Sequence, residues 1–463
     1  MIIHAAKPLF AWDELEDSPS LQSIRSTLQA IPDAALLEAL RQRRHNGCNT
    51  YPVHVLWGVL LLAILLRHLT MEDCLADLRR NGGLRLLIGI ERESQVPHGW
   101  NMTRFLAVLG EEPYLQMLRD IFDFLVQTLG VVVTDLGRHT AGDSTALSGQ
   151  PDTNPTKVQA ETQQGLPQPS GGKKEYRDDD GQVTKTLEWF GYKLHLLVDV
   201  KHEVSLAYHI TDTKTGDNEG IAGLVEQGQA NLPEGRIETL AYDKAADDGK
   251  VHDLLQDQGI KPVIQIRHCW PKDGEQEKVL GGRIPLHVVH DEAGTVYCYD
   301  TQSPKPIKRP MSYDGHEKER GTLKYRCPAK VEGFACASEE KCNAGKPYGM
   351  TVRVPQGIDL RRFPAIPRAT KQFERLYKGR TAVERVNARL KVFWGLDDGQ
   401  VVGARRFHAH VGAVMVVHLA LATQLAAAQR YEGAFGTMTL SPLAARLREE
   451  IDKKKAPPLP VPR

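Results

Sequence analysis

The sequence predicts an α/β protein in which a mixed sheet flanked by helices follows an all-helical N-terminal domain and contains a β-rich insertion. Three observations lead to this prediction. Apolar residues recur at helical spacing between residues 20 and 130. Short apolar strands then alternate with helical segments over 131–265, an order typical of α/β sheets. Finally, short strand-like segments and many turns fill 266–369.

Composition and charge limit the class of protein. The 463 residues suffice for several domains, and 41% hydrophobic and 25% charged residues are typical of a globular protein. Because 59 Lys and Arg face 58 Asp and Glu, any DNA-binding surface must be local. No secretory signal is visible, and the most apolar window, 55–66, is too short to span a bilayer. Seven cysteines, an odd number, do not predict a disulfide framework.

The first domain, 1–130, is predicted to be helical. Asp33 is a good N-cap for the segment that follows it, and Thr70 and Asp73 resemble a capping arrangement. Further helices are predicted over 52–68, 102–109 and 113–129. A domain of this kind could bind DNA or dimerise, but periodicity does not choose between these functions and simple packing.

Strands and helices alternate in the second domain, which comprises 131–265 and 370–430. VVVTDLGRHTAGDSTAL predicts a strand that ends near Asp143, and LAYDKAADD predicts one that ends at Asp243. FGYKLHLLVDV and SLAYHIT predict a hairpin. The segment 150–187 is rich in Pro, Gly, Gln and charge, so we expect a flexible loop, either a DNA-contacting arm or an insertion.

The insertion, 266–369, contains a cysteine cluster. Its members are Cys298, Cys327, Cys336 and Cys342. Four thiolates could hold a structural Zn²⁺. Because no CxxC pair is present, free thiols in a reduced protein explain the cluster equally well. The remainder, 431–463, is predicted to be a C-terminal tail with a disordered, Pro-rich end.

The sharpest local pattern is LYKGRTAVERVNARLK, which we expect on one helix. Its polar members are Tyr377, Arg380, Glu384 and Lys391. At about 100° per residue, the other three fall within roughly 40° of Glu384, beside an apolar stripe. One acid is therefore framed by two cations and a phenol. Taken alone, this pattern would indicate a solvated ion-pair ladder worth a few tenths of a kcal/mol.

Asp143 and Asp243 change that interpretation, because each is an isolated acid at the predicted end of an apolar strand. Together with Glu384 they would form an oxygen-rich site for two Mg²⁺ or Mn²⁺ ions. Phosphodiester chemistry uses such a pair to activate the nucleophile and to stabilise the leaving oxygen. Asp247 and Asp248 could supply a ligand in place of Asp243, but only Asp243 directly ends its strand.

The spacing Tyr-x2-Arg-x3-Glu-x6-Lys resembles, residue for residue, the signature of the YREK group of DDE transposases from bacterial insertion sequences. The segments FGYKLHLLVDV and YDKAADDGKVHDLLQDQGIKPVIQIR are also similar to those that flank the second Asp in that group. The similarity covers about 139–265 and 370–425, and more weakly 52–110.

This resemblance implies a ribonuclease-H-like fold with a metal-binding catalytic triad, Asp143, Asp243 and Glu384. It also implies that DNA near the scissile phosphate is held by Tyr377, Arg380 and Lys391. Arg can fork two phosphate oxygens and Lys offers a point charge, which suits this role. Between residues 361 and 410, 12 Lys and Arg stand against 4 Asp and Glu, a net charge of +8. Such a patch is the expected footprint of phosphate binding, or else an ordinary basic surface.

Four further residues are weaker candidates. Trp270 follows the strand after Asp243, and some transposases of this group insert an aromatic side chain into the DNA end to flip a base. A packed core tryptophan is the more common explanation. His195 and Asp199 share one face of a predicted strand and are interpreted as structural support, and Asp217 as a residue of an N-cap region.

We therefore expect a DNA transposase that nicks insertion-sequence ends with Mg²⁺ or Mn²⁺ and transfers the 3′-hydroxyl strand into target DNA. Its expected partners are terminal inverted repeats, target DNA and a second copy in a synaptic homodimer, with no membrane. We expect it in the bacterial cytoplasm, associated with the nucleoid. The alternatives are a non-catalytic zinc- and DNA-binding protein derived from a transposase, and a host nuclease of the same fold.

Overall fold

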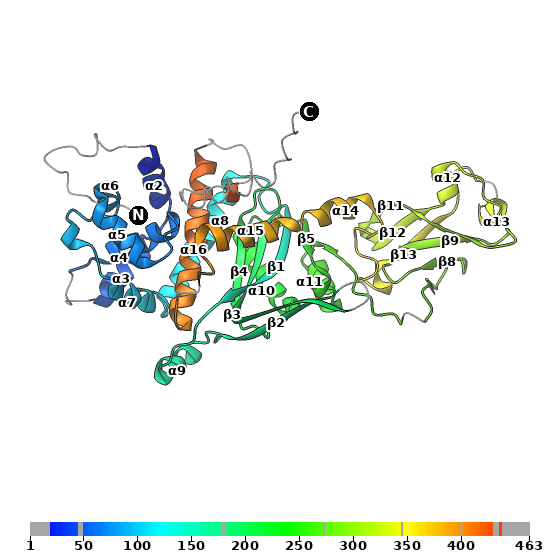
Figure 1. Ribbon diagram of the computed structural model, residues 1–463. Coiled ribbons are helices and arrows are strands. Elements are labelled where there is room, and N and C mark those ends of the chain that lie inside the picture. Colours follow the sequence, from blue (N-terminus) through cyan, green and yellow to red (C-terminus); the bar gives the residue numbers. More distant parts are fainter. Residues whose placement is uncertain are drawn as a thin grey trace, which may run out of the picture.

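The computed structural model describes most of the chain, namely residues 19–44, 50–177, 182–271, 274–343, 346–398, 401–428 and 435–437. The Pro-rich end of the predicted tail lies outside the described residues. Figure 1 shows an elongated molecule, with the N-terminal helices at one end, a mixed sheet in the middle and the β-rich insertion at the other end.

The N-terminal part is helical, as the apolar periodicity predicts. Its helices are α2 (Pro19–Gln29), α3 (Ala34–Arg44), α4 (Val53–Leu65), α5 (Met71–Arg80), α6 (Gly82–Leu87), η1 (Glu93–Gln95), α7 (Gly99–Leu109) and α8 (Tyr114–Val132). The predicted capping box is confirmed, since Thr70 and Asp73 exchange backbone-to-side-chain hydrogen bonds at the start of α5. Nearly all of α4 is buried, so this apolar helix forms the centre of the N-terminal core.

The central sheet is mixed, as predicted. Its strands are β1 (His139–Ser148), β2 (Ser170–Arg177), β3 (Val183–Asp199), β4 (Ser205–Thr211), β5 (Thr239–Tyr242) and β6 (Lys261–Ile264). The strand order is β2-β3-β1-β5-β6, with β4 also paired to β3. β3 is antiparallel to β1 and β4, whereas β1, β5 and β6 are parallel. This arrangement agrees with the ribonuclease-H-like fold that the sequence resemblance implies.

Helices cover the sheet and connect it to the N-terminal part. They are α10 (Asp217–Asn231), η2 (Lys244–Ala246), α11 (Gly249–Asp257), α14 (Lys371–Lys378), α15 (Thr381–Trp394), α16 (Ala404–Ala427) and η5 (Phe435–Thr437). α15 packs on β1 and β3, and α16 packs on α8, α7 and α4 (Figure 1). Of the described helices, only α16 is long and apolar enough to cross a membrane. It is a core helix, because 83% of its most apolar window is buried inside the protein.

The predicted start of the first strand, at Val131, is wrong. The apolar run at Val131 belongs to the end of α8, and β1 begins only at His139. The helical stripe of α8 packs against α16, and this tertiary contact outweighs the β-propensity of three consecutive valines. As a consequence, Asp143 lies in the middle of β1 rather than at its end.

The predicted flexible loop over 150–187 is also wrong. It contains α9 (Pro155–Gln163), which Asn154 caps, and β2, which pairs with the first half of β3. The first half of β3 is mostly exposed along both of its faces. A ribbon of this kind has no apolar alternation that could indicate a strand, so its polar composition predicts a loop.

The insertion is β-rich, as predicted, and has its own hydrophobic core. One sheet contains β7 (Lys278–Val279), β8 (Val288–His290), β9 (Val296–Asp300) and β10 (Ile307–Pro310). The other contains β11 (Ser312–Glu317), β12 (Thr322–Arg326) and β13 (Thr351–Pro355). Short helices complete it, namely η3 (Lys318–Arg320), α12 (Pro328–Glu332), α13 (Glu339–Asn343) and η4 (Gln356–Ile358).

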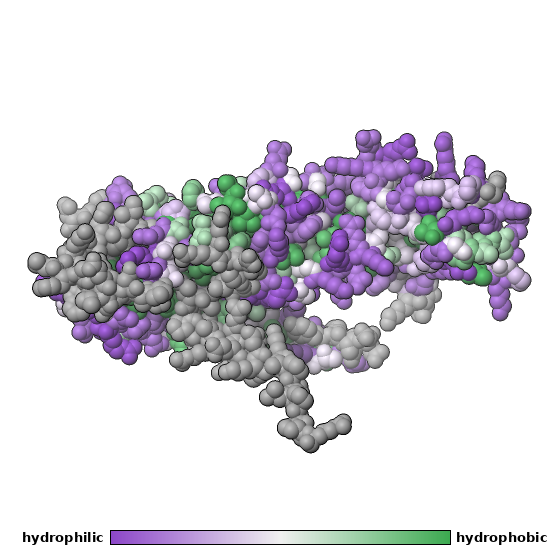
Figure 2. All heavy atoms as spheres, turned by 90° about the horizontal axis from the view of Figure 1, so that it is seen from above, coloured by the Kyte–Doolittle hydropathy of each residue, from purple (hydrophilic) through white to green (hydrophobic). Residues whose placement is uncertain are grey.

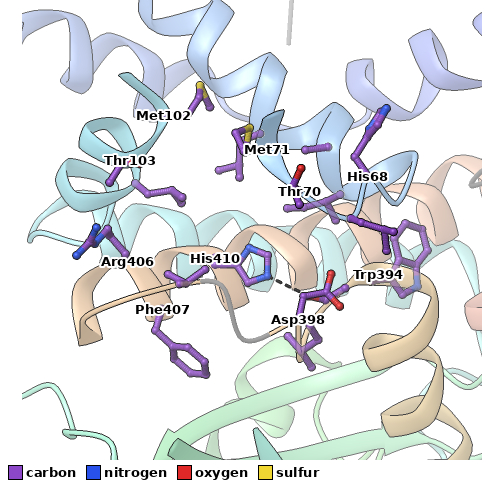
Figure 3. Close-up of a pocket in the computed structure, with 18 of the residues that line it drawn as sticks. His68, Thr70, Met71, Met102, Thr103, Trp394, Asp398, Arg406, Phe407 and His410 are labelled. Carbon is purple, nitrogen blue, oxygen red and sulfur yellow. Dashed lines mark hydrogen bonds between the residues drawn. The ribbon is translucent and has the colours of Figure 1, made fainter. Parts of the chain in front are cut away.

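A cavity of about 200 Å³ lies between the N-terminal helices and the α15–α16 region. Met71 and Met102 line it from the N-terminal side, and Asp398 and His410 line it from the opposite side (Figure 3). The two parts of the molecule therefore meet around an incompletely filled, largely apolar space.

Candidate active site

Asp143 lies in β1, and Asp243 directly follows β5, the neighbouring parallel strand. β1 and β5 pair with Ala141 opposite Ala241, and each aspartate follows its alanine by two residues. Neighbouring strands are roughly 4.8 Å apart, and residues two apart share a face of the sheet. Burial raises the pKa of Asp143 to about 6, and the negative charge of Asp243 contributes to this increase. The structure thus brings together two of the three predicted acids.

The backbone around this pair is closely packed. A Cβ atom at position 142 would lie 2.3 Å from the ring of Tyr242, so Gly142 allows that ring to pack beneath β1. The phenol of Tyr242 is buried, and burial raises its pKa well above the ordinary value. At the end of β5, the Asp243 carboxylate accepts a 2.8 Å hydrogen bond from the backbone of Ala245, which orients it.

Asp217 contacts β1 at Ser144, the residue that follows Asp143. It is in the first turn of α10, and its carboxylate accepts a 2.7 Å hydrogen bond from Ser144 and lies 3.5 Å from the ammonium of Lys193. The sequence placed Asp217 near a helix start, but no pattern indicated its contact with β1. It supports the strand residue next to Asp143.

The predicted single helix that carries Glu384 consists of two helices. α14 ends at Lys378 and α15 begins at Thr381. A Cβ atom at position 379 would lie 2.8 Å from the side chain of Val200, so Gly379 permits the break to approach the end of β3. Arg380 lies at this break and donates a 2.7 Å hydrogen bond to Glu384, whose side chain is 50% exposed.

Tyr377 and Arg380 connect Glu384 to the two aspartates. Burial is the main cause that raises the pKa of Tyr377, and the charges of Asp243 and Glu384 raise it further. Burial tends to lower the pKa of Arg380, but Glu384, Tyr377 and Asp143 raise it overall. All three predicted acids therefore lie within electrostatic reach of this Tyr–Arg pair.

The three carboxylates fit a divalent cation by their chemistry. Burial and a neighbouring charge disfavour the ionised form of Asp143, and a bound cation would compensate for both. In the described part of the chain, no three His, Cys, Asp or Glu side chains already form a metal-binding group. Coordination would require Glu384 to exchange its contact with Arg380 for the cation.

Lys391 and Trp270 have other contacts in this structure. The ammonium of Lys391 donates a hydrogen bond to the Ala146 carbonyl of β1 and lies 3.3 Å from Asp397. Trp270 is half-buried, with the cations of Lys278 and Arg362 at 4.7 and 5.2 Å from its ring. Their predicted roles in DNA binding therefore remain predictions.

The alternative acids have structural partners. Asp247 is fully buried and accepts a 2.7 Å hydrogen bond from Arg361, and Asp248 caps α11. His195 is buried in β3 and hydrogen-bonded to Thr211. Asp199 is buried and accepts backbone hydrogen bonds from Gly137, which precedes β1, and from His202 in the turn that follows β3.

Lys174 is a candidate that sequence reasoning missed. It lies in β2, within the segment predicted to be a loop. Its positive charge lowers the pKa of Asp143, opposing the effect of burial. The hairpin of β2 and β3 therefore brings a cation within electrostatic reach of Asp143, and a polar, two-sided strand gives no sequence signal for this placement.

A basic and aromatic groove lies among the N-terminal helices. Its volume is about 630 Å³, and its lining includes Arg43, Arg44, Tyr51, His98, Trp100 and Arg104. The Trp100 side chain is exposed, and the guanidinium of Arg104 lies 4.9 Å from its ring. Cations combined with an exposed aromatic ring suit nucleic acid binding.

Comparison with known proteins identifies one family. The sequence profile described as "Transposase DDE domain" matches residues 136–420, which is more than half of the chain. The matched region begins just before β1 and ends within α16, and it includes Asp143, Asp243 and Glu384. A comparison with curated proteins gave no match.

Proposed function

Because the chain belongs to the transposase DDE domain family, and is therefore an enzyme of DNA phosphoryl transfer, we propose that it nicks the ends of an insertion sequence and joins the freed 3′-hydroxyl to target DNA. The observation that carries this proposal is the parallel register that sets Asp143 beside Asp243. Two acids at one height on adjacent strands, with Glu384 reached through Arg380, form the carboxylate set that this reaction needs.

Asp143, Asp243 and Glu384 would hold Mg²⁺ or Mn²⁺. When bound, such ions activate the attacking oxygen and neutralise the charge on the leaving oxygen. The protein contributes geometry: the β1–β5 register fixes the spacing of the aspartates, and the hydrogen bond from Ala245 fixes the orientation of Asp243. These acids are held in β1, directly after β5 and in α15, which suits a site that must be preorganised.

Arg380 and Tyr377 bind the phosphate backbone beside these acids. A guanidinium offers two parallel donors to a phosphate, and Arg380 would be free for this contact if Glu384 held a cation instead. Lys391 would also bind phosphate if its ammonium gave up the hydrogen bond to the Ala146 carbonyl. Trp270 would stack on a base. The face above α14 and α15 is mostly hydrophilic from the middle of the molecule to the insertion (Figure 2), as a DNA path requires.

The N-terminal groove binds DNA outside the catalytic site. Arg43, Arg44 and Arg104 contact phosphates, while Trp100 supplies a stacking surface. Joining two transposon ends requires two active sites close together, so we expect a homodimer in the synaptic complex. The reaction takes place in the bacterial cytoplasm, where the nucleoid supplies donor and target DNA.

The decisive experiment is a nicking assay on a supercoiled plasmid that carries the transposon ends. Asp143→Asn should abolish Mg²⁺-dependent nicking and leave end binding intact, because the amide preserves shape but removes the anionic ligand. Asp253→Asn, on an exposed position of α11, is the matched control and should nick normally. Nicking by Asp143→Asn at the control rate would refute the site.

A strand-transfer assay separates a transposase from a host nuclease of the same fold. Pre-nicked transposon ends incubated with target plasmid should give joined products with the native protein. The Glu384→Gln variant should give none. Cutting without joining would contradict the transposase proposal and support the nuclease.

A further inference from the structure

Four cysteines of the insertion meet at one small cavity. Cys298 lies in β9 and Cys342 in α13, whereas Cys327 directly precedes α12 and Cys336 lies between α12 and α13. All four line the same cavity of about 20 Å³. A space of about 10–15 Å³ suffices for one water molecule, so this cavity accommodates a single ion but no organic ligand.

Four of the six described cysteines meet at this cavity, and the other two lie elsewhere. In the described part of the chain, none of the cysteines forms a disulfide, and the two described cysteines outside the cluster are a buried Cys74 and an exposed Cys269. The four clustered thiols are all half-buried. Besides burial, the other three cysteines each raise the pKa of Cys298, which places the sulfur atoms within electrostatic reach of one another.

The position of the cluster explains what a bound ion would do. Cys298 belongs to the four-stranded sheet, and Cys327 follows β12 of the three-stranded sheet. The backbone N–H of Cys327 donates a hydrogen bond to the carbonyl of Met350. This bond joins the two ends of the segment between β12 and β13, which carries Cys336 and Cys342. One ion would therefore join both sheets of the insertion and the segment between β12 and β13. This would stabilise an insertion whose separate core contains few buried residues.

The polar groups around the cavity are consistent with a thiolate-bound cation. The Nε2 atom of His287 lies 3.5 Å from the sulfur of Cys342. Asp300 is already hydrogen-bonded to Ser338 and Ser303, so it does not compete as a ligand. Arg309 also lines the cavity, and its positive charge offsets half of the net negative charge of four thiolates and one dication.

We propose that Cys298, Cys327, Cys336 and Cys342 bind one structural Zn²⁺. Zn²⁺ prefers four thiolates in a tetrahedron at about 2.3 Å, and a site closed by four protein ligands is structural rather than catalytic. Within the described ranges the side chains are not yet in metal-binding geometry. A change of χ1 rotamer moves a cysteine sulfur by roughly 3 Å, which allows the four sulfurs to close on the ion.

The test measures zinc in the full-length protein purified under reducing conditions from zinc-supplemented medium. The native protein should contain about one Zn²⁺ per chain. Replacement by Co²⁺ should give the visible absorption of a tetrahedral site and sulfur-to-cobalt charge-transfer bands. A zinc content near zero, or recovery of the four cysteines as disulfides, would overturn the proposal.

Variants separate the site from a general effect on folding. Cys336→Ser should lose zinc to a competing chelator at least about tenfold more readily than the native protein. Cys269→Ser, outside the cavity, should retain zinc like the native protein. Cys336→His keeps a ligand and should retain zinc with an altered cobalt spectrum, which shows that the insertion still folds. Equal retention by Cys336→Ser and Cys269→Ser would contradict the assignment.

Discussion

Arg67 forms a two-pronged ion pair with Asp398, with nitrogen–oxygen distances of 2.6 and 2.8 Å. Arg67 follows α4 in the N-terminal part, and Asp398 follows the helix that carries Glu384. The guanidinium also donates a 2.9 Å hydrogen bond to the Val392 carbonyl within that helix. This contact connects the N-terminal helices to the end of α15, beside the cavity shown in Figure 3.

Arg67→Lys should lower the free energy of unfolding by about 2 kcal/mol, because the Arg67 side chain is only 8% exposed and an ammonium cannot replace its fork. Urea denaturation measures the change, and a double-mutant cycle with Asp398→Asn isolates the pair. Arg80→Lys, in a pair whose Arg side chain is 77% exposed, should change stability by less than about 0.5 kcal/mol. Equal effects of the two substitutions would show that the contact between Arg67 and Asp398 is unimportant.

Gly379→Ala should reduce nicking roughly tenfold or more while end binding changes little. Its Cβ atom would lie 2.8 Å from Val200, so the break between α14 and α15 must shift and displace Arg380. Single-turnover nicking kinetics measure this effect. Gly223→Ala is the control, because nothing lies within 4 Å of a Cβ atom there and the helix should gain up to about 1 kcal/mol. Normal nicking by Gly379→Ala would show that the break tolerates a side chain.

Lys174→Glu should move the acidic limb of the pH–rate profile for nicking to higher pH. The positive charge of Lys174 lowers the pKa of Asp143, so a negative charge there must raise it, and the reaction needs the ionised carboxylate. Lys173→Glu is the matched control, because successive residues of β2 face opposite sides of the strand. If both variants shift the profile alike, the effect is one of overall charge.

His418→Leu should flatten the loss of stability between pH 6.5 and 5. Burial in α16 lowers the pKa of His418 from 6.5 to about 3, so over this range the unfolded chain binds a proton that the folded chain does not. Stability therefore falls as pH falls below 6.5, by up to about 1.4 kcal/mol per pH unit for this group. Thermal unfolding across this range measures the slope, and His268→Leu, at a side chain 74% exposed, is the control. An unchanged slope in His418→Leu would assign the acid sensitivity to other groups.

The alternation of strands and helices was sufficient to predict the mixed sheet. The position of Asp243 at the end of a strand was also predicted correctly. The boundary between α8 and β1 was not, because three valines favour a strand while the packing of α8 on α16 favours a helix. Only the folded structure shows which of these opposing preferences prevails.

The site shows a similar division. The helical spacing of Arg380 and Glu384 predicted their contact, because it depends on local geometry alone. The pairing of Asp143 with Asp243 depends on the register between β1 and β5, and strand register over such a distance cannot be read from sequence periodicity. Lys174 was missed for the same reason, since its placement depends on a polar hairpin.

The packing of α16 against α4, α7 and α8 has a consequence during synthesis. The ribosome makes these three helices well before α16, so the surface that they share with α16 stays uncovered until residues 404–427 have been translated. If synthesis stops before residue 384, the N-terminal fragment lacks Glu384 and exposes the apolar surface that α16 normally covers. Such a fragment would be a target for chaperones and proteases. The order of synthesis therefore delays the packing of the N-terminal core until α16 has been made.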